Sequence, residues 1–158
     1  MRFKKLLAMG AGLAMASGMM LATPAYATGT GYEGCTPGYW KNHTTNWQEA
    51  EPSDLLSSIY SQARANVAGL TLEEALAGSG GPGADGAAVI LARAATAAWL
   101  NAAHDGLGYP WQRNATSPQG NPPLVATVNA AFLTGSRSAM LELATQLDSD
   151  NNLGCPLN

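Results

Sequence analysis

Charged residues are scarce in this sequence, and so are the residue types from which most catalytic and metal sites are built. Asp, Glu, Lys and Arg make up 12% of the chain, and there are only two histidines and two cysteines. Arg2, Lys4 and Lys5 stand at the very start, and Lys41 is the only other lysine. The rest of the chain has no basic patch, which argues against nucleic acid or an anionic membrane as a partner. Two cysteines without suitably placed histidines argue against a structural zinc site.

Recognisable catalytic motifs and strand patterns are also missing. Residues 78–83 are rich in glycine, but no Lys-Ser or Lys-Thr follows them, as a phosphate-binding loop requires. No alternating apolar and polar pattern reaches the length of a strand, whereas apolar residues recur at helical spacing. We therefore expect an all-α fold: a small irregular helical domain of about five helices with long Gly/Pro loops, closed by one disulfide.

The N-terminus has the order of a secretory signal peptide. A basic stretch is followed by an apolar run from Leu6 to about Ala22 and by the small-residue site Ala25-Tyr26-Ala27. The apolar run is short for a membrane span and is interrupted by glycines. We expect cleavage after Ala27, which divides the chain into a signal peptide (1–27), a flexible lead-in (28–34) and a single helical domain (35–158).

Cleavage would change both the charge and the location of the protein. All eleven acidic residues follow the signal segment, whereas three of the eight basic residues lie within it, so the processed chain would carry a net charge of −6. No other segment is apolar enough to insert into a membrane, so we expect a secreted, extracellular protein, or a periplasmic one if the host is Gram-negative.

The two cysteines, Cys35 and Cys155, stand near the two ends of the processed chain. Disulfides persist outside the cytoplasm, and two cysteines allow one intramolecular pairing. Closing so long a loop stabilises a fold by about 4–5 kcal/mol through the lost entropy of the unfolded chain. The alternative is a pair of free thiols or a bridge between molecules.

Capping residues and apolar spacing place the first helices. Residues 35–43 are expected to be irregular because Pro37 and Gly38 interrupt them. One helix is expected from about Pro52 until Gly69. Thr71 and Glu74 match a capping box, which predicts a short helix ending at Ala77.

The second half should contain three further helices. A central buried helix is expected from about Gly86 to His104, with Asp85 as its cap, because apolar residues occur nearly all round it. After a long loop over 105–123, Pro122-Pro123 should lead into a helix through Thr134 that Gly135 ends. Ser136 or Ser138 should open the last helix, whose predicted inner face is Met140, Leu141, Ala144 and Leu147.

One nine-residue run, Cys35-Thr36-Pro37-Gly38-Tyr39-Trp40-Lys41-Asn42-His43, resembles the opening of a module of exported bacterial proteins. The resemblance continues in Leu100-Asn101-Ala102-Ala103-His104 and in Tyr109-Pro110, and it closes with Gly154-Cys155-Pro156-Leu157. It covers nearly the whole processed chain. It implies an exported bacterial module and supplies neither an activity nor catalytic residues.

The two histidines, His43 and His104, form the first candidate site. They could act as metal ligands or as acid and base in catalysis, with Lys41 beside them. They could instead belong to a structural lock, because a polar strip holding Arg93 and His104 on an apolar helix must find partners if it is buried. We favour the lock, with Lys41, Asn42 and His43 as the partners of that strip.

A second candidate is a binding surface built from aromatic and amide side chains. Aromatic rings on loops can stack on sugar rings or dock a partner, but in a small domain they more often anchor the loop on the core. The candidates are Tyr39, Trp40, Asn42, Trp47, Asn101, Tyr109 and Trp111.

A third candidate lies at the end of the last predicted helix. Asp148, Asp150 and Asn152 place oxygen atoms at alternating positions, as calcium loops do. The glycine of that pattern comes one place late, at Gly154, and Asp and Asn commonly end helices. We therefore expect no metal or cofactor, and calcium binding is a weak alternative.

Taken together, these patterns favour a non-enzymatic exported domain for cell-surface, matrix or partner interaction. Its partner would be an extracellular protein or a polysaccharide. The alternative is a small secreted enzyme, such as a hydrolase, or a metal-binding protein that uses His43 and His104. An enzyme should show both histidines facing one concave pocket together with a third polar group.

Overall fold

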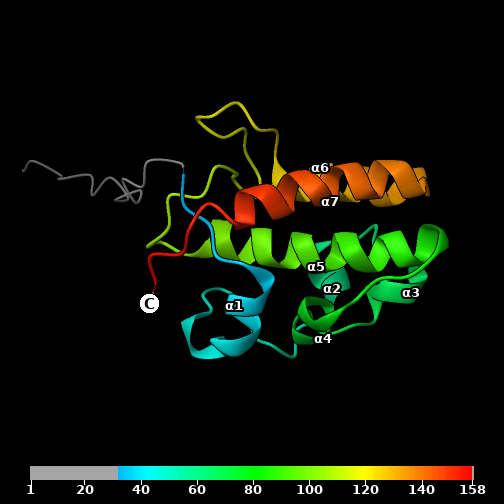
Figure 1. Ribbon diagram of the computed structural model, residues 1–158, viewed down its shortest axis with the longest axis horizontal. Helices are drawn as coiled ribbons and strands as arrows, with labels where there is room; N and C mark the ends of the chain where they lie inside the picture. Colours follow the sequence, from blue (N-terminus) through cyan, green and yellow to red (C-terminus); the bar gives the residue numbers. More distant parts are fainter. Residues whose placement is uncertain (1–31, 158) are drawn as a thin grey trace, which may run out of the picture.

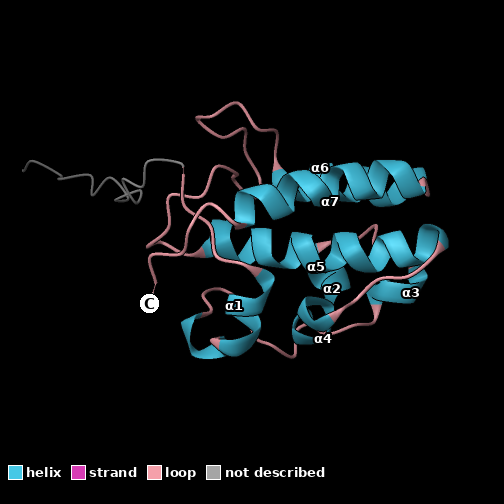
Figure 2. Cartoon of the chain, in the orientation of Figure 1, coloured by secondary structure: helices cyan, strands magenta, loops and turns pink. Residues whose placement is uncertain are grey.

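The computed structural model describes residues 32–157; the expected signal peptide and its cleavage site lie outside this range. Within it the chain is helical, and its only β-pairing consists of two isolated bridges (Figures 1 and 2). The predicted all-α class is confirmed, although the described residues form seven α-helices and one 3-10 turn instead of about five helices. These elements are α1 (Pro37–Asn42), η1 (Thr44–Asn46), α2 (Leu56–Ile59), α3 (Ala65–Ala68), α4 (Leu72–Ala77), α5 (Gly83–Ala103), α6 (Leu124–Thr134) and α7 (Arg137–Asn151).

Helix α5 forms the centre of the fold, between α6 and α7 on one side and the short helices α1 to α4 on the other (Figure 1). Its length and composition would allow it to cross a membrane, but 78% of its apolar stretch of 18 residues is buried inside the protein. Most of its buried residues are alanines, whose small side chains let neighbouring helices approach closely. Helix α5 is therefore the core helix that the sequence predicts.

Helices α5 and α7 run in the same direction, and α6, which lies between them in the sequence, runs in the opposite direction (Figure 1). The reversal from α6 to α7 occurs at Gly135, which ends α6 in the left-handed conformation (φ 61°) that glycine adopts without strain. Ser136 then caps α7 by accepting a hydrogen bond from the backbone N–H of Ala139. Both the stop and the cap agree with the sequence-based prediction.

The opening run is helical, which corrects the irregular structure predicted for residues 35–43. Thr36 is the N-cap of α1, and its hydroxyl accepts a hydrogen bond from the backbone N–H of Tyr39 (3.1 Å). Pro37 occupies the first helical position, where its missing N–H has no intrahelical partner to lose. Thr36-Pro37 therefore starts a helix, because proline interrupts a helix in its interior but is favoured at the first helical position.

The single helix expected from Pro52 to Gly69 is wrong, because the chain forms α2 and α3 with a turn between them. Helix α2 ends at Ile59, and its C-cap is Tyr60, whose ring is buried and whose hydroxyl donates to the carbonyl of Ala95 on α5 (2.9 Å). This long-range contact overrides the local periodicity. The capping box of Thr71 and Glu74 is confirmed at the start of α4.

Helix α5 begins at Gly83, one turn before the predicted start. Asp85 consequently lies inside the first turn and pairs with Arg64 (2.9 Å) instead of capping the helix. At the other end, α5 stops at Ala103 with His104 as the C-cap.

Candidate functional site

The two ends of the described chain are joined beside the C-terminal ends of α5 and α7. Cys35 and Cys155 form the predicted disulfide, with their Cα atoms 4.5 Å apart. One residue away on each side, the N–H of Gly34 donates to the carbonyl of Gly154 (3.0 Å). Gly34 lies so close to the carbonyl of Asp150 that a side chain there would overlap it. The close backbone approach therefore requires glycine at position 34.

Asn101, near the end of α5, is fully buried and binds the opening of the chain through its side-chain amide. Its Oδ1 accepts hydrogen bonds from the backbone N–H of Cys35 (2.8 Å) and from Nε1 of Trp40 (3.0 Å). Its Nδ2 donates to the carbonyl of Cys35 (2.9 Å) and to Oδ1 of Asn151 on α7 (2.9 Å). These four bonds use both donors and both acceptor positions of the amide.

Asn151 extends this arrangement to the long loop between α5 and α6. Its Oδ1 also accepts from the hydroxyl of Tyr109 (2.8 Å), and its Nδ2 donates to the carbonyl of Ala94 (3.0 Å). Burial raises the pKa of Tyr109 well above its usual value, which keeps the hydroxyl protonated as a donor. We call this group the Asn101 network: the Cys35 backbone together with the side chains of Trp40, Asn101, Tyr109 and Asn151.

Four of the seven side chains proposed as a binding surface are buried: Trp40, Asn101, Tyr109 and Trp111. Trp111 donates through Nε1 to the carboxylate of Asp150 (2.7 Å) and so anchors the same long loop on α7. These four residues hold loops on the core and have little surface to offer a ligand. Tyr39 and Trp47 are half-buried, and Asn42 is exposed.

His43 is exposed at the end of α1, and its ring stacks on the ring of Tyr39 with the centroids 4.2 Å apart. Its Nδ1 lies 2.8 Å from the carbonyl of Tyr39. Because a carbonyl oxygen can only accept, Nδ1 carries the proton of this hydrogen bond. In the neutral ring Nε2 is therefore an acceptor.

His104 is half-exposed at the C-terminal end of α5. Its Nδ1 accepts a hydrogen bond from the N–H of Gly106 (3.0 Å). Partial burial lowers the pKa of His104, and the negative charge of Asp105 opposes this shift. The neutral tautomer with the proton on Nε2 satisfies this arrangement.

The two histidines do not converge on a common centre. Ring contacts run from His43 to Tyr39, from Tyr39 to Trp40 and from Trp40 to His104, the last pair with centroids 5.9 Å apart. Each histidine bonds a backbone group close to it in sequence, and within residues 32–157 neither bonds the other or a carboxylate.

The predicted partners of the polar strip on α5 are corrected by the structure. Lys41, Asn42 and His43 are exposed, and so is Arg93, which therefore needs no protein partner. The opening segment does pack against α5, but it does so through Cys35 and Trp40. The residue in the sequence that could have indicated this contact is Asn101, because its amide lies on a largely buried and apolar helix and needs partners.

Within residues 32–157, no three or more His, Cys, Asp or Glu side chains form a cluster that could hold a metal ion. The calcium candidates make separate contacts. Asp150 accepts from Trp111 (2.7 Å), and Asn152 donates to the backbone carbonyl of Asp148 (2.6 Å). On a helix, residues 148 and 150 point to opposite sides, so their carboxylates do not face one ion.

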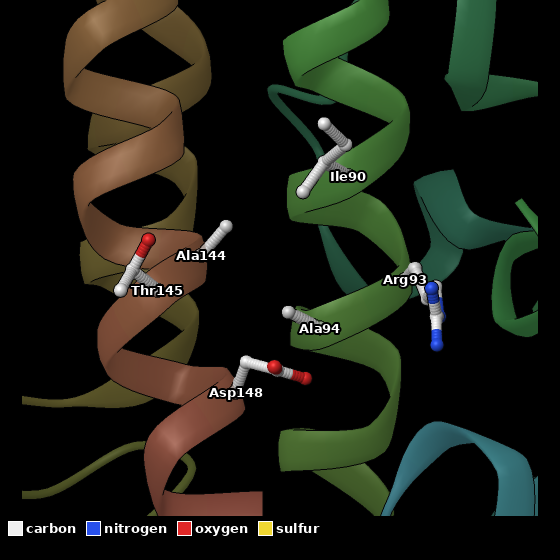
Figure 3. Close-up of a pocket in the computed structure, with 6 residues that line it drawn as sticks. All are labelled: Ile90, Arg93, Ala94, Ala144, Thr145 and Asp148. Carbon is white, nitrogen blue, oxygen red and sulfur yellow. The ribbon is translucent and has the colours of Figure 1, made fainter. Parts of the chain in front are cut away.

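A shallow cavity of about 160 Å³ lies between α5 and α7 (Figure 3). It is lined by Ile90, Arg93, Ala94, Ala144, Thr145 and Asp148. Asp148 points towards α5, whereas the guanidinium of Arg93 lies on the side of α5 away from α7 (Figure 3). The cavity is smaller than the roughly 300–1,000 Å³ of ordinary ligand pockets, and neither histidine lines it.

Comparisons with protein-family models, with curated proteins and with solved structures gave no match. The class of protein is therefore defined by its own features. It is a small all-α domain whose ends are joined by a disulfide and by a buried network of hydrogen-bonded amides. A disulfide of this kind is typical of an oxidising environment.

Proposed function

We propose that this protein is exported and works as a non-enzymatic domain that binds a partner at a cell surface or in an extracellular matrix. The location is supported by the signal-peptide pattern at the N-terminus and by the Cys35–Cys155 disulfide, which persists in oxidising compartments. The resemblance of the opening and closing motifs to exported bacterial proteins points in the same direction.

The Asn101 network is the observation that carries the non-enzymatic part of the proposal. A catalytic centre needs polar groups that remain free to meet a substrate. Here the buried amides of Asn101 and Asn151 and the hydroxyl of Tyr109 bond to one another and to the backbone. This arrangement fits a group that stabilises the fold and holds the surface segments in place.

The alternative, an enzyme or a metal protein that uses His43 and His104, has less support. It requires both rings to face one cavity with a third polar group. His43 stacks on Tyr39, whereas His104 contacts Trp40, and each histidine is already bonded to a backbone group.

The test of this proposal is the fate of the full chain in its native host. An antibody against the domain would follow it in medium, cell-surface, membrane and cytosolic fractions, with a cytosolic enzyme as the marker of lysis. We expect the protein in the medium or attached to the cell surface, beginning at Thr28 by mass spectrometry. Recovery of intact Met1 in the cytosol or the membrane would contradict the proposal.

Catalysis is tested separately with His43→Ala and His104→Ala. Attachment of the purified domain to host cells should survive His104→Ala, because His104 does not belong to the Asn101 network. A hydrolytic activity or a bound metal in the wild type that both substitutions abolish would favour the enzyme or metal alternative.

A further inference from the structure

One corner of the molecule carries mainly uncharged polar and aromatic side chains, with the exposed Lys41 beside them. Helix α1 and η1 form a small lobe that projects from α5 (Figures 1 and 2). The seven residues from Asn42 to Gln48 include no Asp, Glu, Lys or Arg. The α1–η1 surface is formed by the exposed and half-exposed residues Asn42, His43, Thr44, Thr45, Asn46 and Trp47.

Hydrogen bonds directed inwards hold this surface in place. Nδ2 of Asn46 donates to the hydroxyl of Tyr39 (2.7 Å), and that hydroxyl donates to the carbonyl of Leu157 (2.9 Å). Nε1 of Trp47 donates to the carbonyl of Trp40 (3.0 Å), and Trp40 belongs to the Asn101 network. The surface is therefore ordered before a ligand arrives, which lowers the entropy cost of binding.

The polar atoms that remain without a protein partner on this surface are mainly acceptors and hydroxyls. Asn42 uses Nδ2 to donate to the carbonyl of Gly38 (2.8 Å), which leaves its Oδ1 available. The Nε2 of His43 and the hydroxyls of Thr44 and Thr45 make no hydrogen bond within residues 32–157. A ligand rich in hydroxyl groups can donate to these acceptors and exchange hydrogen bonds with these hydroxyls.

Aromatic rings stand beside these polar atoms. The ring of His43 is covered on one face by Tyr39, with the two planes 12° apart, and His43 as a whole is exposed. Trp47, four residues further along the chain, is half-buried. An aromatic ring face can pack against the C–H groups of a sugar ring while neighbouring polar atoms bind its hydroxyls.

From these contacts we propose that the α1–η1 surface binds a neutral polysaccharide. This inference rests on the proposed function and names the chemical class of its partner. An acidic polymer is disfavoured because Lys41 is the only cation next to the segment, and the processed chain would be acidic.

A folded protein partner fits the α1–η1 surface less well, because protein–protein interfaces cover about 800 Å² of each partner and have an apolar centre. The most exposed large apolar residues lie elsewhere, at Tyr32, Leu55, Leu133 and Leu153.

The experiment is affinity electrophoresis of the disulfide-bonded processed protein in gels that contain one polysaccharide each. The neutral probes are amylose, laminarin, dextran, galactomannan and hydroxyethyl cellulose, and the acidic probes are alginate and polygalacturonate. We expect retardation in at least one neutral gel and none in the acidic gels, and the dependence of mobility on polymer concentration yields the dissociation constant.

Two exposed side chains test the site directly, with a matched control. Thr45→Ala and His43→Ala should each weaken the affinity by about threefold to tenfold, the effect of one lost hydrogen bond or ring contact. Thr116→Ala removes the same group from the exposed loop between α5 and α6 and should leave the affinity unchanged. Thr45 makes no side-chain hydrogen bond in the described chain, so Thr45→Ala should fold normally, and circular dichroism checks each variant.

Three results would overturn the inference: no retardation in any neutral gel, retardation in acidic gels alone, or equal affinity in Thr45→Ala, His43→Ala and the wild type. Loss of binding to host cells that were treated with protease and washed before the domain was added would also overturn it, because that result identifies a protein partner. Export and surface attachment in the fractionation experiment would stand after any of these failures. The two proposals therefore fail separately.

Discussion

Asn101 uses every hydrogen-bonding position of its amide, and three of its four partners belong to the opening segment of the chain. Replacing Asn101 with Ala would leave the N–H and the carbonyl of Cys35 and Nε1 of Trp40 buried without their partner. Each buried polar group left unpaired costs about 1–3 kcal/mol. We expect Asn101→Ala to lower the free energy of unfolding by about 3 kcal/mol or more, measured by urea denaturation.

Asn114→Ala is the control for this substitution. Asn114 is exposed on the loop between α5 and α6, and the same change of side chain there should alter the free energy of unfolding by less than about 0.5 kcal/mol. A loss below about 1 kcal/mol for Asn101→Ala would show that water replaces the amide and that the network contributes little.

His104 should make stability depend on pH. Its pKa in the folded protein is lower than the ordinary value of 6.5 because burial disfavours the charged ring. The unfolded chain therefore binds a proton at a higher pH than the folded protein does. Stability is fully present above about pH 6.5 and should fall as the pH drops from there through the folded pKa.

The substitution His104→Asn separates this titration from the rest of the protein. Asn places an acceptor near the position of Nδ1, so the hydrogen bond from the N–H of Gly106 can persist, but it does not titrate. We expect thermal unfolding of His104→Asn to depend less on pH between 7 and 5 than that of the wild type. Parallel profiles would mean that other groups cause the dependence.

At the scale of helices, Gly86 in the first turns of α5 decides how the glycine-rich loop packs. A Cβ at this position would overlap the carbonyl group and the Cα of Gly81, which are backbone atoms and cannot turn aside. Helix propensity alone favours Ala over Gly by about 0.5–1 kcal/mol, but overpacking typically costs about 1–3 kcal/mol. We expect Gly86→Ala to lower the free energy of unfolding by at least about 1 kcal/mol.

Gly69 offers the opposite case for the same substitution. It ends α3 with φ −88° and ψ 0°, which Ala also adopts, and a Cβ there would meet no atom within 4 Å. Gly69→Ala should leave stability unchanged or raise it by about 0.4–1 kcal/mol, because Ala restricts the unfolded chain. If both substitutions changed the urea midpoint alike, the contact between Gly86 and Gly81 would have no role.

The elements that the sequence predicts well are those whose causes are local. The capping box of Thr71 and Glu74 and the stop at Gly135 each depend on residues within one turn, and the structure contains both. The division of the segment before Gly69 was missed because the hydroxyl of Tyr60 bonds Ala95, thirty-five residues away. Local periodicity carries no information about such a contact.

The same reasoning applies to the candidate site. The pairing of Cys35 with Cys155 was predictable because only one intramolecular pairing exists. The role of Asn101 was missed because its partners Cys35 and Asn151 are 66 and 50 residues distant in sequence. The sequence drew attention instead to the two histidines, which are rare here, and rarity alone does not bring side chains together.

At the scale of the whole molecule, covalent and non-covalent contacts hold the same two chain ends. The disulfide, the backbone pairing of Gly34 with Gly154 and the hydrogen bond from Tyr39 to Leu157 lie together at the C-terminal ends of the parallel helices α5 and α7. A disulfide acts mainly by restricting the unfolded chain, whereas hydrogen bonds stabilise the folded state directly. The two contributions should therefore be separable by mutation.

Replacing both cysteines with Ser should lower stability without opening the fold. The lost restriction of the unfolded chain is worth up to about 4–5 kcal/mol, and a change of 1 kcal/mol shifts Tm by about 3–5 °C in a domain of this size. Because the Asn101 network still holds the opening segment, Cys35→Ser/Cys155→Ser should keep its helical circular dichroism at 25 °C.

Adding Asn101→Ala to the double variant should then release the opening segment. Lys41, the only lysine in residues 32–157, reports this release, since a lysine-specific protease should cut the triple variant there and spare the double variant. Equal cleavage of the two variants, or reactive thiols in the native wild-type monomer, would refute this division of roles between the disulfide and the network.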